Sequence, residues 1–352
     1  MRGTRELEEL ARRLTTPMTH RGPDGTGGWC GAGDAAGNGW VALGHRRLAI
    51  IDLATGAQPM SSEDARIVVS FNGEIYNHRE LRVELERRGC RFRTSSDTEV
   101  LIHGWREWGI SLLERLNGIF AFALADATQR RVLLARDPAG VKPLYVGVGA
   151  GLTWFASELS AARAAGLSRM AADPDALKLY LTFGFVPSPF AAHPDSWKVP
   201  PSHYAFVTPD AAGQPPEFFA YSTKVRSTHA PRGRAQWRDA LANELDSAIR
   251  RQMLSDVPVG TLLSGGVDSS VVTASMAATG APPQAFAIGF SDGGVNEADA
   301  ARRAAGELRV PVDVVETTRA EYLEGWNEAL AQLSEPVANP GLRLVDLLCR
   351  HV

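Results

Sequence analysis

Two rhythms of apolar and polar residues divide the chain. Between residues 41 and 156, apolar residues form short runs broken by Gly, Asp and Asn, which is typical of β-strands. Apolar residues at helical spacing predict helices over residues 4–14, 80–88 and 98–108. Helices that cover packed sheets are the layered arrangement that this order favours. The expected strands are residues 41–43, 48–53, 67–71, 119–125, 132–135, 144–148, 152–156 and 203–208.

A different rhythm begins at Gln236. Every fourth residue is apolar along one helical face, and this face consists of Trp237, Leu241, Leu245, Ile249 and Met253. Expected strands then alternate with expected helices, an order that predicts a parallel, doubly wound sheet. The strands are residues 257–263, 284–290 and 312–316, and the helices are residues 267–278, 297–308 and 320–333.

The two rhythms meet in a polar segment. Residues 222–234 are rich in Ser, Thr, Lys and Arg and contain Pro231 and Gly233, as is typical of an interdomain linker. We therefore expect one domain over residues 1–221 and a second over residues 235–352. The length agrees, because a chain of 352 residues is long for a single core.

Composition limits the kinds of partner. Charged residues make up 22% of the chain and the formal net charge is −3, which argues against a nucleic-acid surface. Cys30, Cys90 and Cys349 are far apart in the sequence and indicate neither a disulfide framework nor a zinc site, so a reducing compartment fits best. The sequence has no apolar run near the ~20 residues of a membrane span. We expect a cytoplasmic protein that binds neither nucleic acid nor membrane.

A short glycine-rich segment joins the first strand of the second domain to its first helix. Residues 263–270 read L-S-G-G-V-D-S-S. Gly265 and Gly266 lack the Cβ atoms that would keep a phosphate from the backbone, and the helix start offers unpaired N–H groups. The Lys of the G-x-x-x-x-G-K-[ST] loop is missing, so the segment matches the pyrophosphate loop of enzymes that split ATP between its α and β phosphates. The alternative is an ordinary strand-to-helix turn, which needs only one Gly.

Five sequence blocks together resemble the glutamine-hydrolysing asparagine synthetases along nearly the whole chain. They are R-G-P-D at 21–24, H-R-R-L-A-I-I-D at 45–52, F-N-G-E-I-Y-N at 71–77, S-D-T-E at 96–99 and the loop at 263–270. Their order and spacing argue against coincidence. The resemblance implies a two-domain α/β protein. Its first domain is an αββα sandwich of the N-terminal-nucleophile hydrolase type, a glutamine amidotransferase. Its second is a doubly wound, parallel-sheet ATP-pyrophosphatase domain.

The resemblance also implies an activity. Members of this family amidate aspartate to asparagine through a β-aspartyl-AMP intermediate, with ammonia from glutamine, and release AMP, pyrophosphate and glutamate. Glutamine, aspartate and ATP are therefore the implied small-molecule substrates, and Mg²⁺ is the implied metal. A homodimer is compatible with the family.

The implied glutamine site has a physical rationale. Free glutamine carries a carboxylate, onto which Arg47 can fork, and an ammonium group, which Asp97 and Glu74 can accept. Attack on the side-chain amide makes an oxyanion, for which the Asn72 side chain and the Gly73 N–H are matching donors. The alternative for Asn72-Gly73 is a hairpin turn, which this dipeptide favours by itself. The family pattern adds four neighbours of Arg47 to the glutamine-binding set: Leu48, Ala49, Ile50 and Ile51.

The implied ATP site lies in the second domain. The family pattern assigns the pyrophosphate to Ser264, Gly265, Gly266, Asp268 and Ser269. It assigns the adenosine to Leu263 and Ile288, although both are also expected as plain core residues. Two further family blocks, residues 136–138 and 142–145, are best interpreted as scaffold of the glutaminase domain.

The sequence departs from the family pattern at both ends. The family nucleophile is a Cys that becomes the first residue once Met is removed, with its own α-amine as base, whereas Met1 is followed here by Arg2. Neither Cys30 nor Cys90 has a free α-amine. We therefore expect the first strand and the nucleophile of the glutaminase domain to be missing, so that this chain does not hydrolyse glutamine. The synthetase domain is expected to be truncated to its N-terminal part.

Two alternatives stay open. A relative such as a β-lactam synthetase or lasso-peptide cyclase adenylates a carboxylate and closes an amide without glutamine. A non-catalytic remnant is the other alternative. The retained set Arg47, Asn72, Gly73, Glu74 and Asp97 favours an asparagine synthetase, because a domain that no longer used glutamine would have no physical need for these residues.

Overall fold

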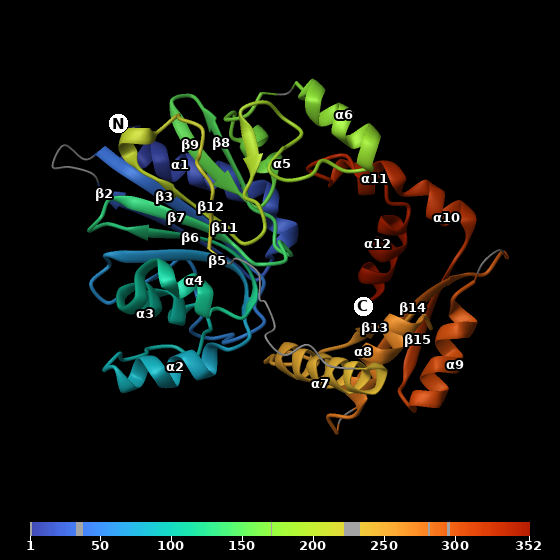
Figure 1. Ribbon diagram of the computed structural model, residues 1–352. Helices are drawn as coiled ribbons and strands as arrows, with labels where there is room; N and C mark the ends of the chain where they lie inside the picture. Colours follow the sequence, from blue (N-terminus) through green and yellow to red (C-terminus); the bar gives the residue numbers. More distant parts are fainter. Residues whose placement is uncertain (1, 33–37, 170, 222–232, 281, 294–295) are drawn as a thin grey trace. The chain divides into compact units, whose positions relative to one another are not determined.

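A computed structural model shows two compact units (Figure 1). The first consists of Met1–Lys224 with Ser334–Val337, and the second of Val225–Leu333 with Ala338–Val352. The expected linker, residues 222–234, lies outside the described residues except for its last two positions. The structure describes residues 2–32, 38–169, 171–221, 233–280, 282–293 and 296–352.

A six-stranded antiparallel sheet forms the centre of the first unit, in the order β12-β11-β7-β6-β5-β4 (Figure 1). Its longest pairing joins β5 to β6 and runs from Ile67 opposite Asp126 to Ile75 opposite Gly118. At the outer edge, β4 pairs with β5 only at Val68 and Val69. The strands are β4 (Met60–Ser61), β5 (Ile67–Ile75), β6 (Gly118–Asp126), β7 (Arg131–Arg136), β11 (His203–Val207) and β12 (Phe219–Ala220).

Two three-stranded antiparallel sheets face this sheet, in the orders β1-β3-β2 and β10-β8-β9. Alternate residues of β3 and β8, such as Leu43 and Val146, form one buried cluster with Val68, Ala123 and Leu134 of the central sheet. Apolar side chains of both layers therefore meet face to face. These strands are β1 (Arg2–Gly3), β2 (Gly25–Ala32), β3 (Asn38–Arg47), β8 (Tyr145–Gly149), β9 (Leu152–Ala156) and β10 (Ser196–Lys198).

Helices cover both outer faces of these layers. On the far side of the central sheet, Leu85, Leu101 and Leu112 pack on Phe71 and Phe122. On the other side, α1 and α5 share a cluster with β8 and β9. The αββα sandwich expected for the N-terminal domain is confirmed. The α-helices are α1 (Thr4–Thr15), α2 (His78–Arg87), α3 (Glu99–Trp108), α4 (Leu112–Arg115), α5 (Leu159–Ala164) and α6 (Pro174–Phe183), and the 3₁₀ helices are η1 (Thr16–Arg21), η2 (Gly109–Ser111) and η3 (Pro209–Ala211).

The strand expected at residues 48–53 is wrong, because this segment is a loop. The Arg47 guanidinium donates to the carbonyl oxygens of Ile51 and Leu53, both at 3.2 Å, and to that of Asp52. Asp52 itself has a positive φ of 53°. Carbonyl oxygens that accept from a side chain are not available for hydrogen bonds to another strand. The apolar run at residues 48–53 therefore does not form a strand.

The second unit has a three-stranded parallel sheet in the order β13-β14-β15 (Figure 1). Strands and helices alternate along the chain, so the predicted parallel α/β arrangement is confirmed. The strands are β13 (Thr261–Leu262), β14 (Ala285–Phe290) and β15 (Val312–Thr317), and the helices are α7 (Arg234–Gln252), α8 (Val267–Ala277), α9 (Ala298–Leu308), α10 (Arg319–Glu324), α11 (Trp326–Ala331) and α12 (Gly341–His351).

Two elements of the second unit differ from the expectation. The strand expected over residues 257–263 is reduced to β13, since Pro258 lacks an N–H for the ladder. The helix expected over 320–333 breaks at Gly325 into α10 and α11. A Cβ at Gly325 would collide with the buried guanidinium of Arg343, so the break accommodates this side chain.

The apolar face of α7 is exposed at its amino-terminal end, whereas Leu245, Ile249 and Met253 are half-buried. Among the described residues, α7 buries none, and the side chains of Trp237 and Leu241 are 56% and 60% exposed. The outer edge of β13 pairs with no strand of the described sheet. No helix in the described part of the chain is both long and apolar enough to cross a membrane.

Four residues from far along the chain complete the first unit. Within Ser334–Val337, the Glu335 carboxylate accepts hydrogen bonds from the Tyr145 hydroxyl at 3.1 Å and the Ala192 N–H at 2.8 Å, and it pairs with the Lys198 ammonium. Both charged side chains are nearly buried. Burial and the nearby Glu335 carboxylate raise the pKa of Tyr145, so its hydroxyl stays a donor.

Truncation of a side chain between α2 and the central sheet should destabilise the first unit. Leu85 is fully buried, so Leu85→Ala should lower the free energy of unfolding by about 2–5 kcal/mol. Val83 lies on the same helix with 46% of its side chain exposed, so Val83→Ala should change stability by less than about 0.5 kcal/mol. Urea unfolding would measure both, and equal losses would contradict the assigned core.

Candidate functional site

The candidate site of the first unit lies along the open edge of β5. Since β4 covers only Val68 and Val69, later N–H groups on this edge need other acceptors. The N–H of Phe71 donates to Oε1 of Gln58 at 2.7 Å, and the N–H of Ile75 donates to Oδ2 of Asp97 at 2.9 Å. Side chains from two loops thus replace a neighbouring strand.

Gly73 lies midway between these two donors. Alternate residues of a strand direct their N–H groups to the same side, so the Gly73 N–H shares the edge with those of Phe71 and Ile75. Its cross-strand partner, Phe120, donates to Asp137 at 3.3 Å and not to β5, which agrees with this orientation. Among the described residues, the structure records no acceptor for the Gly73 N–H. It is therefore available to an oxygen atom of a ligand.

Asn72-Gly73 does not form a hairpin turn, so that alternative is wrong. Both residues lie inside β5, opposite Ala121 and Phe120. Gly73 has a positive φ of 153°, and an added Cβ would collide with the carbonyl oxygen of Ile119. Close approach to β6, and not a turn, explains the glycine.

The loop that follows Arg47 connects the other expected residues to this edge. Arg47 closes the loop through backbone carbonyls, as described above, and Gln58 at its far end holds the Phe71 N–H. The Asp52 carboxylate accepts from the Ser95 N–H at 2.9 Å, two residues before Asp97. The loop therefore bridges β5 and the segment that carries Asp97. Leu48 is exposed, and Ala49, Ile50 and Ile51 are half-buried in the same loop.

A buried histidine aligns the two facing sheets beside the site. His45 Nδ1 lies 3.1 Å from the Ser70 hydroxyl, and the two residues precede Arg47 and Asn72 by two positions each. Burial, assisted by the Arg47 charge, lowers the pKa of His45 to about 4, so the ring is neutral at pH 7. This contact places Arg47 of β3 and Asn72 of β5 at corresponding positions, each two residues after the contact.

Two carboxylates give the site a negative character. Asp97 is buried, and burial raises its pKa although the Ile75 N–H bond lowers it in part. Burial and the Asp97 charge also raise the pKa of Glu74, whereas the Lys142 charge lowers it. A ligand ammonium would relieve this repulsion. Lys142 was expected only as scaffold, and no feature of its own block indicated that its charge would act on Glu74.

The blocks around Arg136 do form scaffold. The Arg136 guanidinium donates to the carbonyl oxygens of Lys142 and Gly140 at 2.7 Å and of Val199 at 2.8 Å. Asp137 accepts from the N–H groups of the turn that follows. These bonds fix the turn that carries Lys142.

The two cysteines of the described first unit show no activation. Cys30 lies in β2 and Cys90 follows α2. Burial raises the pKa of both thiols, and a nearby glutamate, Glu8 or Glu107, raises each further. A nucleophilic thiol needs the opposite shift.

In the second unit, the Ser264 loop follows β13 directly. The Ser264 and Ser269 hydroxyls lie 3.0 Å apart, and the Gly266 N–H donates to Ser264 Oγ at 3.3 Å. Gly265 has a positive φ of 76°, and a Cβ there would collide with Ala300 of α9. Both the backbone conformation and the packing therefore require a glycine.

The start of α8 offers backbone donors to this loop. Its N-cap residue, Gly266, makes no side-chain cap. Among the described residues, the N–H groups of Val267, Asp268 and Ser269 have no recorded acceptor, and the first helical bond runs from Ser270 to Gly266. The Asp268 side chain is exposed beside them. Such a helix start favours an anion.

The two apolar residues expected at a nucleotide belong to adjacent strands: Leu263 directly follows β13, and Ile288 lies inside β14. Leu263 is buried, and its N–H donates to the carbonyl of Phe286 on β14 at 2.8 Å. Ile288, two residues further along β14, is half-buried. The described residues include no group of three or more His, Cys, Asp or Glu side chains that could hold a metal ion.

Two family models match the chain. The model described as a glutamine amidotransferase domain matches residues 1–218, more than half of the chain, and the model described as asparagine synthase matches residues 240–352. The chain belongs to the glutamine amidotransferase domain family. The asparagine synthase match follows in the order that the five blocks predicted, so the predicted resemblance to asparagine synthetases is confirmed.

Three relatives are similar to this chain. The glutamine-hydrolyzing asparagine synthetase 1 of Bacillus subtilis is 34% identical over 337 residues, which covers 96% of this chain and 51% of that protein. Glutamine-hydrolyzing asparagine synthetase 1 of Arabidopsis thaliana is 38% identical over 271 residues, 75% of this chain and 38% of that protein. That of Sandersonia aurantiaca is 38% identical over 265 residues, 75% of this chain and 42% of that protein. The chain spans about half or less of each relative.

Neutralisation of Asp97 should stabilise the protein at neutral pH. Because its folded-state pKa is raised, the folded protein binds this proton more tightly, and stability falls as pH rises from the unfolded-state pKa through the folded-state pKa. Asp97→Asn removes the charge but keeps an oxygen for the Ile75 N–H. The variant should be at least as stable as the parent near pH 7, with a smaller difference near pH 4.

Urea unfolding at both pH values would measure this difference. Asp210 lies on the exposed η3 segment, so Asp210→Asn is a matched control that should leave stability unchanged at either pH. An Asp97→Asn variant that is equally destabilised at both pH values would contradict the electrostatic interpretation.

Proposed function

We propose that this chain contributes the glutamine site and the ATP-pyrophosphate site of an ATP-dependent ligase that amidates aspartate to asparagine. One observation supports this proposal: in the described part of each unit, backbone N–H groups have no recorded acceptor, at Gly73 in the first unit and at the start of α8 in the second. Each set lies within a block typical of glutamine-hydrolysing asparagine synthetases. We propose for this chain the activity that the names of its relatives state.

In the first unit, the proposed ligand is glutamine. Its ammonium group binds the Asp97 and Glu74 carboxylates, which repel each other when the site lacks a cation. Its carboxylate binds Arg47, whose Nε–H has no recorded acceptor in the described part of the chain. The amide oxygen then accepts from the Gly73 N–H and the Asn72 side chain, which would stabilise an oxyanion.

Binding and hydrolysis are separate in this proposal. Hydrolysis needs a nucleophile, and the raised pKa values of Cys30 and Cys90 argue against either thiol in that role. We therefore infer that the 352-residue chain binds glutamine better than it hydrolyses it.

In the second unit, the proposed ligand is ATP. The aspartate β-carboxylate attacks the α-phosphorus, and the bond to the departing pyrophosphate breaks. Ser264, Gly265, Gly266, Asp268 and Ser269 hold the pyrophosphate, with the α8 start as the donor of backbone N–H groups. Ammonia then attacks the acyl carbon and displaces AMP, so that asparagine forms and a proton is released.

Leu263 and Ile288 pack beside the adenosine in this proposal. Mg²⁺ fits only as a companion of the ATP phosphates, because the described residues present no cluster of three metal ligands.

The organisation and setting of the enzyme complete the proposal. We place the glutamine amidotransferase domain at residues 1–221, the linker at 222–234 and the synthetase part at 235–352. The enzyme is proposed to be cytoplasmic and able to form a homodimer. Its partners are the small molecules glutamine, aspartate and ATP.

Glutamine binding should depend on Arg47 and not on its neighbour. Arg46 lies on the opposite face of β3, where its Nε contacts the Thr15 carbonyl oxygen at 3.4 Å. Calorimetric titration of the chain with glutamine should show affinity reduced about tenfold or more by Arg47→Ala, as expected for loss of charge-assisted bonds, and unchanged by Arg46→Ala. Binding that survives Arg47→Ala would overturn the pocket assignment.

ATP binding should depend on the shape of the Ser264 loop. Gly265→Ala should abolish binding because the Cβ collides with Ala300, whereas Gly306→Ala in α9 meets no atom within 4 Å and should leave binding intact. In a protein with the full length of the relatives, the reaction should release AMP and pyrophosphate, and Asp268→Ala should abolish it. Release of ADP and phosphate would refute the loop assignment. A carboxylate other than aspartate as acceptor would favour the β-lactam-synthetase-like alternative.

A further inference from the structure

Strand β4 ends just before the part of the β5 edge that the candidate site occupies. Met60 lies opposite Val69, and in an antiparallel pair each step back along β4 corresponds to one step forward along β5. In this register residue 58 would lie opposite Phe71, and residue 56 opposite Gly73. The backbone carbonyls of a longer β4 would therefore accept the N–H groups of Phe71 and Gly73. The edge is open because β4 does not extend that far.

Gln58 supplies the missing acceptor with its side chain. Its Oε1 accepts from the Phe71 N–H at 2.7 Å. Its backbone carbonyl is turned toward the facing sheet, where a Cβ on Gly27 of β2 would collide with the oxygen. Pro59, the next residue, has no N–H to offer to a neighbouring strand. The side-chain amide of Gln58 therefore takes the place of a backbone carbonyl at this position of the ladder.

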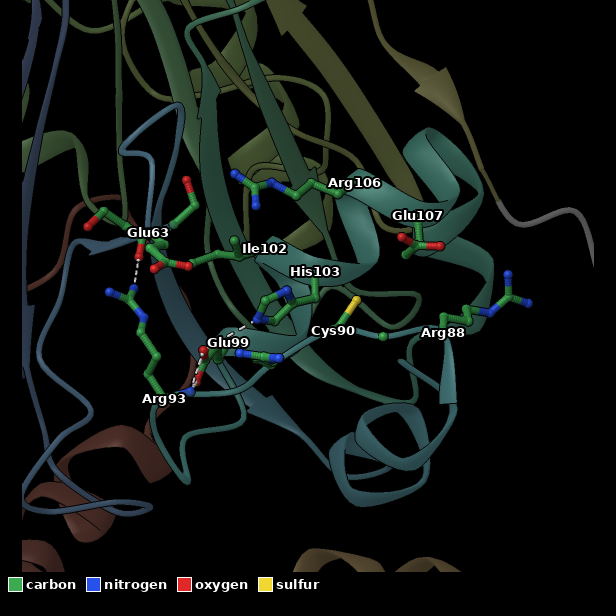
Figure 2. Close-up of a pocket in the computed structure, with 13 residues that line it drawn as sticks. Glu63, Arg88, Cys90, Arg93, Glu99, Ile102, His103, Arg106 and Glu107 are labelled. Atoms are coloured by element: carbon green, nitrogen blue, oxygen red, sulfur yellow. Dashed lines mark hydrogen bonds and ion pairs between the residues drawn. The ribbon is translucent and has the colours of Figure 1, made fainter. Parts of the chain in front are cut away.

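The segment that carries Gln58 is anchored by β4. The Arg93 guanidinium donates to the carbonyl oxygen of Ser61 in β4, and the Arg93 N–H donates to the Glu99 carboxylate at 2.9 and 3.1 Å (Figure 2). Glu99 lies two residues after Asp97, the other side-chain acceptor of the β5 edge. Both acceptors thus belong to one hydrogen-bonded framework.

We propose that Gln58 is a positioning residue for the amide group of bound glutamine, an inference that rests on the proposed glutamine site. The N–H groups of Phe71 and Gly73 lie about 7 Å apart along the edge, because they are two strand residues from each other. Glycine restrains its own backbone less than other residues do, so the direction of the Gly73 N–H depends on neighbouring bonds. Gln58 acts on the amide end of the ligand through this backbone, whereas Arg47 and Asp97 hold the amino-acid end.

Titration calorimetry with glutamine and with L-norvaline separates the two ends of the ligand. Norvaline has the same α-amino and α-carboxylate groups and the same number of side-chain carbons, but it lacks the amide. Gln58→Met keeps the length of the side chain and removes the acceptor. This variant should bind glutamine about fivefold more weakly, as expected for loss of one hydrogen bond, and norvaline less than about twofold more weakly.

A conservative variant should restore the preference for glutamine. Gln58→Glu keeps an oxygen acceptor at the same length, so its ratio of glutamine to norvaline affinity should match that of the parent. Any effect of the added charge falls on the α-amino and α-carboxylate groups, which both ligands share. Gln129→Met is the matched control, because it makes the same change at an exposed glutamine between β6 and β7. It should alter neither affinity.

Amide hydrogen exchange in the ligand-free protein reports the hydrogen bond itself. NMR should show faster exchange of the Phe71 N–H in Gln58→Met than in the parent or in Gln58→Glu. The N–H of Leu124, in the neighbouring strand β6, should exchange at the same rate in all three proteins. This second measurement shows that the sheet remains folded in the variants.

The inference is overturned if Phe71 exchanges faster in Gln58→Met but both ligands are weakened equally, because the bond would then serve only the fold. It is also overturned if exchange at Phe71 does not change, or if Gln58→Glu does not restore the preference for glutamine. A parent chain that binds neither ligand, or binds both equally, would refute the proposed glutamine site, and this inference with it.

Discussion

The first unit depends on how the open edge of β5 satisfies its backbone. A strand edge that no other strand covers must find acceptors for its N–H groups or leave them to solvent or ligand. Here Gln58 and Asp97 supply acceptors for Phe71 and Ile75. Both acceptors are side chains of loops. The same hydrogen bonds therefore satisfy the N–H groups of the edge and hold the two loops against β5. Gly73 lies between Phe71 and Ile75, and its N–H has no recorded acceptor among the described residues. The candidate site is therefore a gap in the hydrogen-bond ladder of this edge.

The acceptors at this edge carry a cost that suits a binding site. Asp97 is a buried carboxylate whose pKa is raised, and its charge also raises the pKa of Glu74. A protein optimised only for stability would use an amide here. The second unit follows a similar principle, because the start of α8 is left without a side-chain cap. In both units, groups that are incompletely satisfied by the protein lie where the proposed ligands carry the complementary charge.

Local pattern was enough to predict most of the architecture. The period of the apolar residues gave the β-rich first unit and the alternating second unit, and the double glycine at 265–266 indicated the loop after β13. The failures have tertiary causes. The apolar run at 48–53 became a loop because Arg47 bonds its carbonyls, and the helix through Gly325 broke because Arg343, distant in sequence, packs against that glycine.

Part of the candidate site was equally hidden from the sequence. The proposed roles of Asn72, Gly73 and Asp97 were accessible from motifs, whereas Gln58 and Lys142 come to this edge only through the folding of distant loops.

The contact of Glu335 with Lys198 has a consequence for folding during translation. Lys198 is nearly buried, and its carboxylate partner belongs to the same compact unit, although every described element of the second unit except α12 lies between the two residues in the chain. An amino-terminal unit emerging from the ribosome therefore carries a buried cation without its counter-ion until residue 335 has been translated. The packing around Lys198 can therefore be completed only after residue 335 has been translated, when most of the sequence of the second unit has already been made.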